Sequence, residues 1–176
     1  SHLSDSGVCP FGDLKTYLTS YQSSRDPSLF DASRDICGQD VKTEFINYGM
    51  QIANGMDFLE SEEIVLRTLT SRSIYIGYNK ECKVTDLGLS TAVMSLAEFE
   101  LETRGRLPVR WMALESLLDC FYTTKSDTWS FGIVLWEIFS FGCVPYAGLS
   151  PNELTHELQR GYRIPKPLHC DKHMLV

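Results

Sequence analysis

Residues 107–116 read LPVRWMALES and residues 126–132 read SDTWSFG, and these two stretches decide the fold of this chain. The second stretch opens a run, 126–139, in which apolar side chains occur on nearly all sides of a helix. A helix that is apolar all round belongs in the interior of a protein. The sequence therefore predicts a central, buried helix over 126–139.

Two further helices are predicted upstream. Within 41–59, apolar residues recur at alternating steps of three and four, which is the spacing of one buried helix face. The residues on this face are Phe45, Gly49, Ile52, Met56 and Leu59. A shorter helix is predicted over 12–20. The polar stretch 22–40 is broken by Pro and Gly and predicts a loop between the two helices.

A small β-hairpin is predicted next, because two short β-type runs, 73–76 and 82–85, flank the turn 77–80. Residues 91–106 show no clean period and predict a loop. Residues 150–153 read SPNE, a capping-box pattern with Pro at the first helical position, which predicts the start of another helix. The order of elements indicates a mainly α protein with one small hairpin.

Composition narrows the function classes. Hydrophobic content of 43% and charged content of 22% are typical of a soluble globular chain of 176 residues. The net charge is −7 and the basic residues are scattered, which argues against a nucleic-acid or anionic-membrane surface. The six cysteines lie far apart, with no C-x-x-C pair. A disulfide framework is formally possible, but a chain of this size needs none, so free thiols are favoured over disulfides and over a metal site.

Several motifs together resemble a protein kinase domain of the receptor tyrosine kinase family, and the resemblance covers nearly the whole chain. The motifs are residues 12–18 (GDLKTYL), 86–88 (DLG), 107–116, 126–132, 145–146 (PY) and 161–163 (GYR). The LPVRWMA part of the third stretch is specific to tyrosine kinases. In the catalytic loop, Arg72 lies where receptor-type members keep an arginine.

This resemblance implies a fold class and a setting. Residues 1–176 would form the C-terminal lobe of the protein-kinase-like fold, from the hinge to the start of a late helix, with 22–40 as an insert-like loop. The N-terminal β lobe is expected to be absent, because no G-x-G-x-x-G motif occurs. By resemblance the cofactors are ATP and Mg²⁺. The location would be cytoplasmic, in the intracellular part of a single-pass receptor whose membrane contact lies outside this chain.

The catalytic loop departs from the pattern of this family, which reads His-Arg-Asp, four residues, then Asn. Here residues 66–73 read LRTLTSRS. Thr68 replaces the carboxylate that accepts and orients the substrate hydroxyl, and losing a general base typically costs about 10²–10⁴-fold in rate. Ser73 replaces the Asn that binds the second metal ion, and it is a weak Mg²⁺ ligand. Leu66 replaces the His, and is expected to pack against Leu87.

Other positions given by the resemblance leave alternatives open. Asp86 either still binds a metal ion or only supports its loop. Tyr75 falls under the adenine position, where it either blocks the nucleotide or swings aside. Phe99 lies near the place of the regulated tyrosine, and the glutamates around it supply fixed negative charge or form an ordinary solvated loop. Asp127 is expected to brace the catalytic loop by accepting backbone N–H bonds.

Three functions follow as hypotheses. The preferred one is a pseudokinase that acts as a signalling scaffold or as an allosteric partner, with an active kinase or a receptor homologue as its protein partner. The alternative is an active receptor-type tyrosine kinase that transfers the ATP γ-phosphate to protein tyrosine. The third is a truncated product that sequesters binding partners or is degraded. Whether the chain is an enzyme stays open, because Thr68 occupies the place of the catalytic Asp.

Overall fold

The structure is a computed structural model that describes residues 9–23, 39–85, 87–103, 106–167 and 170. Its elements follow in chain order: α1 (Leu14–Ser23), α2 (Gln39–Ser61), β1 (Ile74–Ile76), β2 (Cys82–Val84), α3 (Leu96–Thr103), α4 (Leu114–Asp119), α5 (Thr124–Phe139) and α6 (Pro151–Gln159). Single 3₁₀ turns lie at Ser71–Ser73, Leu87–Leu89 and Val109–Trp111. In the described part of the chain, no helix combines the length and the apolar character needed to cross a membrane.

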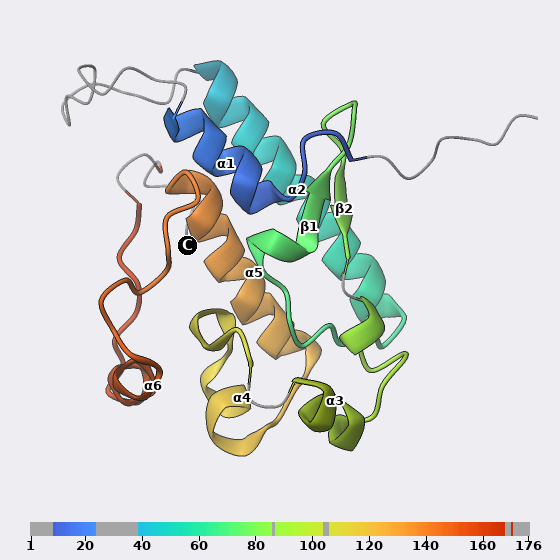
Figure 1. Ribbon diagram of the computed structural model, residues 1–176, viewed down its shortest axis with the longest axis vertical. Helices are drawn as coiled ribbons and strands as arrows, with labels where there is room; N and C mark the ends of the chain where they lie inside the picture. The colour runs from blue at the N-terminus through green and yellow to red at the C-terminus, as the bar shows by residue number, and fades with distance from the viewer. Residues whose placement is uncertain (1–8, 24–38, 86, 104–105, 168–169, 171–176) are drawn as a thin grey trace, which may run out of the picture.

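Helix α5 runs through the middle of the molecule, with α1 and α2 on one side and α4 and α6 on the other (Figure 1). It begins at a capping box in which the Thr123 hydroxyl accepts the Ser126 N–H and the Ser126 hydroxyl accepts the Thr123 N–H. Ile133, Val134 and Ile138 on this helix are buried. The predicted central helix is confirmed.

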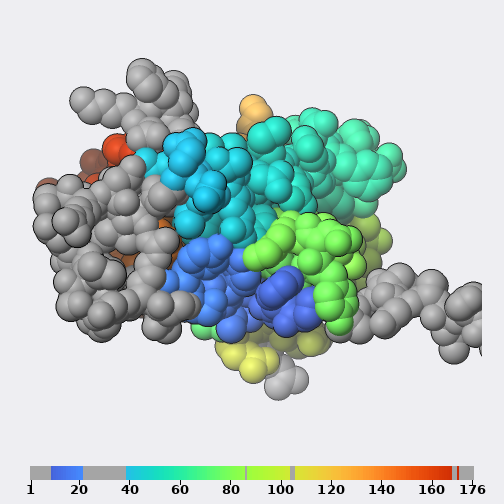
Figure 2. Space-filling view, turned by 90° about the horizontal axis from the view of Figure 1, so that it is seen from above, coloured from blue at the N-terminus to red at the C-terminus, as the bar shows by residue number. Residues whose placement is uncertain are grey.

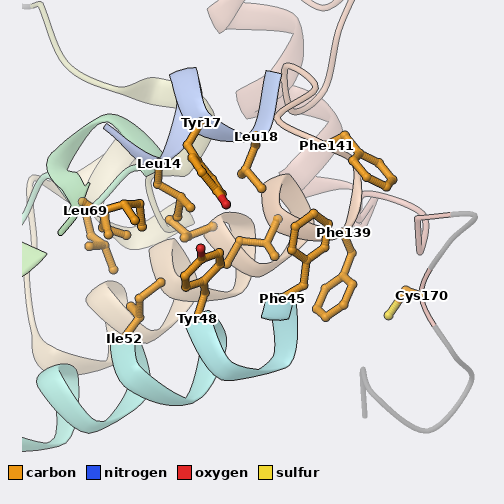
Figure 3. Packing of buried hydrophobic residues seen from close by; sticks show 14 of the residues in the cluster. Leu14, Tyr17, Leu18, Phe45, Tyr48, Ile52, Leu69, Phe139, Phe141 and Cys170 are labelled. Atoms are coloured by element: carbon orange, nitrogen blue, oxygen red, sulfur yellow. The ribbon is translucent and has the colours of Figure 1, made fainter. Parts of the chain in front are cut away.

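Helix α2 packs across α5 through the predicted face. Phe45 and Ile52 are fully buried, whereas Met56 is only partly buried. Gly49 permits the close approach of the two helices, because a Cβ there would lie 3.0 Å from Cδ2 of Leu135 on α5. Figure 3 shows this core, where aromatic and aliphatic side chains from α1, α2 and the end of α5 meet.

The predicted hairpin is confirmed as an antiparallel pair with Tyr75 opposite Lys83. Its burial alternates, because Ile74 and Ile76 are fully buried while Tyr75 between them is 38% exposed. The amide of Ile76 donates to the carbonyl of Gly12, which joins the start of α1 to β1. Figure 2 shows α1, α2 and the hairpin side by side on one face of the molecule.

The loop prediction for 91–106 was wrong, because the chain forms helix α3 there. Ser95 and Glu98 make a reciprocal cap, in which the Ser95 amide and hydroxyl both donate to Glu98 Oε2, at 2.9 and 2.7 Å. Only Phe99 and Thr103 of this helix are buried. Two buried residues are too few to give a detectable hydrophobic period, whereas the S-x-x-E capping pattern is visible in the sequence.

The C-terminal part matches the prediction. Ser150 caps α6, the Ser150 amide donates to Glu153 at 2.8 Å, and Leu154 and Leu158 are buried. The predicted loop 22–40 is shorter at both ends, because α1 continues to Ser23 and α2 begins at Gln39; residues 24–38 lie outside the described residues. Cys9, Cys82, Cys120 and Cys143 have free thiols, as expected.

Candidate functional site

The loop predicted to be catalytic is held in place by one buried carboxylate. Asp127, in the first turn of α5, accepts the Leu66 amide at 2.6 Å through Oδ2 and the Arg67 amide at 3.0 Å through Oδ1. The prediction that Asp127 braces this loop is therefore confirmed. Burial raises the pKa of Asp127 to about 6, although the two amides and the Arg67 charge act in the opposite direction.

Leu66 is 2% exposed and belongs to the main core cluster. Leu87, its expected packing partner, is 44% exposed and lies outside that cluster. The core, rather than Leu87, accounts for the burial of Leu66. Thr68 is half-buried two residues further along the same loop.

Ser73 ends the loop, and its hydroxyl is used within the loop itself. It donates to the carbonyl of Thr70 and accepts the Thr70 amide, each at 2.9 Å, which completes the capping box of the turn Ser71–Ser73. The carbonyl of Ser73 accepts the amide and the hydroxyl of Thr85, at 2.7 and 3.0 Å. The structure thus joins the loop to the residue directly before Asp86.

The remaining predicted site residues are dispersed around this junction. Arg72 is exposed on the 3₁₀ turn, and Tyr75 is on β1 with its side chain 38% exposed. Asp86 lies outside the described residues. The metal-binding role of Asp86 and the adenine-blocking role of Tyr75 stay predictions.

The described residues of this loop offer only weak ligands for a Mg²⁺ ion. Mg²⁺ prefers carboxylate and phosphate oxygens in octahedral geometry. Thr68 offers a neutral hydroxyl, and the Ser73 hydroxyl already bonds to Thr70. Across the described residues, no three His, Cys, Asp or Glu side chains gather closely enough to hold a metal ion.

A buried glutamate also binds this loop, and the sequence analysis did not identify it. Glu137 on α5 is fully buried and accepts the Ser71 hydroxyl at 2.8 Å and the Trp111 indole N–H at 2.7 Å. Lys15 on α1 approaches the same carboxylate at 3.8 Å. Burial raises the pKa of Glu137, although these donors oppose the rise. The available signal was one acidic residue inside the apolar run 131–139.

A family model described as protein tyrosine and serine/threonine kinase matches residues 6–176. The chain belongs to this kinase family. The kinase domain fragment is 39% identical over 163 residues, or 93% of the chain, to the tyrosine kinase receptor Cad96Ca of Drosophila melanogaster. It is 43% identical over 129 residues, or 73% of the chain, to the tyrosine-protein kinase receptor torso of Bombyx mori.

The fragment spans 21% of the length of Cad96Ca and 16% of the length of torso. It is a mainly helical kinase-domain fragment with a two-stranded antiparallel sheet, related to receptor tyrosine kinases. Membership of this kinase family implies ATP and Mg²⁺ binding in general.

A second polar cluster is formed by residues outside the predicted catalytic loop of the kinase fragment, and no sequence pattern indicates it. Glu44 on α2 accepts three tyrosine hydroxyls: Tyr17 at 2.6 Å, Tyr21 at 2.7 Å and Tyr48 at 2.5 Å. The ammonium group of Lys80, from the hairpin turn, lies 3.2 Å from the same carboxylate. Figure 3 shows the Tyr17 and Tyr48 hydroxyls pointing towards each other between α1 and α2.

The charge of Glu44 is strongly stabilised by this cluster. Burial by itself would raise the pKa of Glu44, but the three hydroxyls and Lys80 together lower it to about 2. The same arrangement raises the pKa values of the tyrosines, through burial first and then through Glu44. The cluster joins α1, α2 and the hairpin turn by charge-assisted hydrogen bonds.

Proposed function

We propose that this kinase domain is a pseudokinase that acts by binding, as a signalling scaffold or as an allosteric partner of an active kinase or a receptor homologue. The observation that carries the proposal is the state of the loop 66–73. By the resemblance, Thr68 occupies the place of the catalytic carboxylate, and the hydroxyl of Ser73, at the place of the metal-binding Asn, forms hydrogen bonds with Thr70.

The chemistry of phosphoryl transfer explains why the residues at positions 68 and 73 matter. The reaction depends on metal ions that neutralise phosphate charge and on a carboxylate that orients the attacking hydroxyl. A threonine hydroxyl does not accept a proton near neutral pH. Loss of the base alone costs about 10²–10⁴-fold, and a missing metal ligand adds a further loss.

The scaffold around the loop is intact, which supports a binding role. Asp127 still braces the loop, and Glu137 still joins the loop to α1 and to Trp111. Because the relatives are receptors by name, the proposed setting is the cytoplasmic part of a single-pass membrane receptor. The proposed partner is a protein, and the scattered basic residues favour no nucleic acid.

The test is phosphate transfer by the full-length protein to a tyrosine-containing peptide with Mg²⁺-ATP. We expect no transfer above the level of an Asp86→Asn variant. Asp119→Asn serves as the matched control, because Asp119 is exposed at the end of α4. Turnover in the wild type that Asp86→Asn abolishes and Asp119→Asn preserves would overturn the proposal.

One observation favours the alternative, an active receptor-type tyrosine kinase. The LPVRWMA stretch is held firmly, because Arg110 donates to the carbonyls of Pro145, Tyr146 and Leu149 at 3.1, 2.6 and 2.8 Å. Thr68→Asp separates the two functions. A rise from undetectable to measurable transfer would show that the wild type lacks the activity. Measurable wild-type transfer that Thr68→Asp leaves within about threefold would support the active kinase, because a missing base costs more than that.

A further inference from the structure

A cleft of about 200 Å³ lies between the C-terminal part of α2 and the start of α5. On one side of the cleft the two helices touch, because Gly49 permits a close approach to α5. On the other side the Thr124 hydroxyl donates to Oε1 of Glu60 at 3.2 Å. Between these contacts lie Ala53 and Thr128, whose short side chains leave space between the helices.

The wall of this cleft is mainly apolar and is part of the folded core. The α2 positions 53, 56, 57 and 60 and the α5 positions 124, 127, 128 and 131 each follow the spacing of a single helix face. The apolar wall consists of Met56, Leu59, Ile64 and Phe131, which belong to the main core cluster or pack against it. Because the core holds these side chains, the cleft is preformed.

Two carboxylates lie at the open edge of this apolar wall. Asp57 and Glu60 are both exposed, and among the described residues neither forms an ion pair with a Lys, Arg or His side chain. Asp127 also lines the cleft, but its oxygens already accept the Leu66 and Arg67 amides. The charge that the cleft offers to a ligand is therefore that of Asp57 and Glu60.

An apolar wall beside two unpaired carboxylates is complementary to a cation on an aliphatic stem. A lysine side chain has this form, because its methylene groups cover apolar surface while its ammonium group stays in contact with water. The planar head of arginine suits bidentate pairing with one carboxylate, whereas a compact ammonium group can lie between two. An anionic side chain would be repelled by both carboxylates.

We propose that the cleft between α2 and α5 is a docking site for a lysine side chain of a protein partner. The stem of the lysine lies against Met56 and Phe131, and its ammonium group lies at Asp57 and Glu60. The inference rests on the proposed binding function, for which it names the chemistry of the partner. No residue of the loop 66–73 lines the cleft, so the binding experiment needs no phosphate transfer. Transfer that overturned the pseudokinase proposal would leave the result of that experiment unaffected.

Saturation-transfer difference NMR on the full-length protein tests the site. The probe is an alanine pentapeptide with lysine at its centre, and the matched peptide has norleucine there, which keeps the stem without the charge. We expect the lysine peptide to bind at least about threefold more tightly, as for an exposed ion pair. Added salt should weaken its binding. Equal binding of the two peptides would overturn the proposal.

Three protein variants locate the binding. Glu60→Gln should weaken the lysine peptide about threefold and leave the norleucine peptide unchanged. Ala53→Leu fills the cleft and should abolish the binding of both peptides. Glu62→Gln is the matched control, because Glu62 is exposed after the end of α2 and does not line the cleft. An equal loss in Glu60→Gln and Glu62→Gln would overturn the proposal, since the net charge would then attract the peptide. Unchanged binding in Ala53→Leu would overturn it as well.

Discussion

Replacing Glu44 by glutamine removes the charge that three tyrosine hydroxyls and Lys80 stabilise, with almost no change of shape. In the folded protein the pKa of Glu44 falls from the ordinary 4.5 to about 2. At about 1.4 kcal/mol per pKa unit, the fold favours the ionised carboxylate over the neutral one by about 3 kcal/mol. The side chain is 23% exposed, so solvent screens part of this term and leaves about 2 kcal/mol. The neutral amide of glutamine should lose about the same amount.

The pH dependence makes the prediction specific. Because the pKa of Glu44 is lowered on folding, its contribution is fully present above pH 4.5 and is lost as pH falls towards 2. Glu44→Gln should therefore lower the free energy of unfolding by about 2 kcal/mol at pH 7, and the difference from wild type should shrink steadily below pH 4.5.

Urea denaturation followed by tryptophan fluorescence at several pH values measures this difference. Glu62→Gln is the matched control, since Glu62 is exposed after the end of α2 and its replacement should cost less than about 0.5 kcal/mol. A cost for Glu44→Gln below about 1 kcal/mol at pH 7 would refute the reasoning. A cost that stays constant on acidification would refute it as well.

Three further outcomes are expected. Burial raises the pKa of Asp127 from 3.8 to about 6, so its contribution to the free energy of unfolding is present below pH 3.8 and is lost as pH rises through 6. Asp127→Asn should therefore remove this pH dependence of the free energy of unfolding from urea titrations between pH 3.8 and pH 6. Gly49→Ala should lower the free energy of unfolding by about 1 kcal/mol in thermal scans, because crowding against Leu135 outweighs the gain in helix propensity. Ser95→Ala should speed amide exchange in α3 about fivefold, as expected for the loss of a helix cap.

The long elements could be predicted because their signals are local and repeated. Helix α2 shows its buried face at steps of three and four over 41–59, and α5 is apolar on nearly all sides. The caps of α5 and α6 involve residues three apart, so the sequence alone contains both partners. The roles of Thr68 and Ser73 come from a resemblance, and they stay predictions that only the transfer assays test.

Helix α3 shows where prediction from the local sequence fails. Its cap at Ser95 was visible in the sequence, but its stability depends on Phe99 packing against Tyr122 and Arg67, which a search for periodicity does not detect. The Glu44 cluster is a stronger case, because its partners come from α1, α2 and the hairpin turn. Nothing in the spacing of Tyr17 and Lys80 indicates that they share one carboxylate.

The sequence by itself determined the kinase family, the central buried helix, the hairpin and the absence of a carboxylate at position 68. Only the tertiary structure decided which charges are buried and which groups surround them. The reason is physical: hydrophobic period and capping act between neighbours along the chain, whereas the partners of Glu44, Arg67 and Glu137 come together only when distant segments pack.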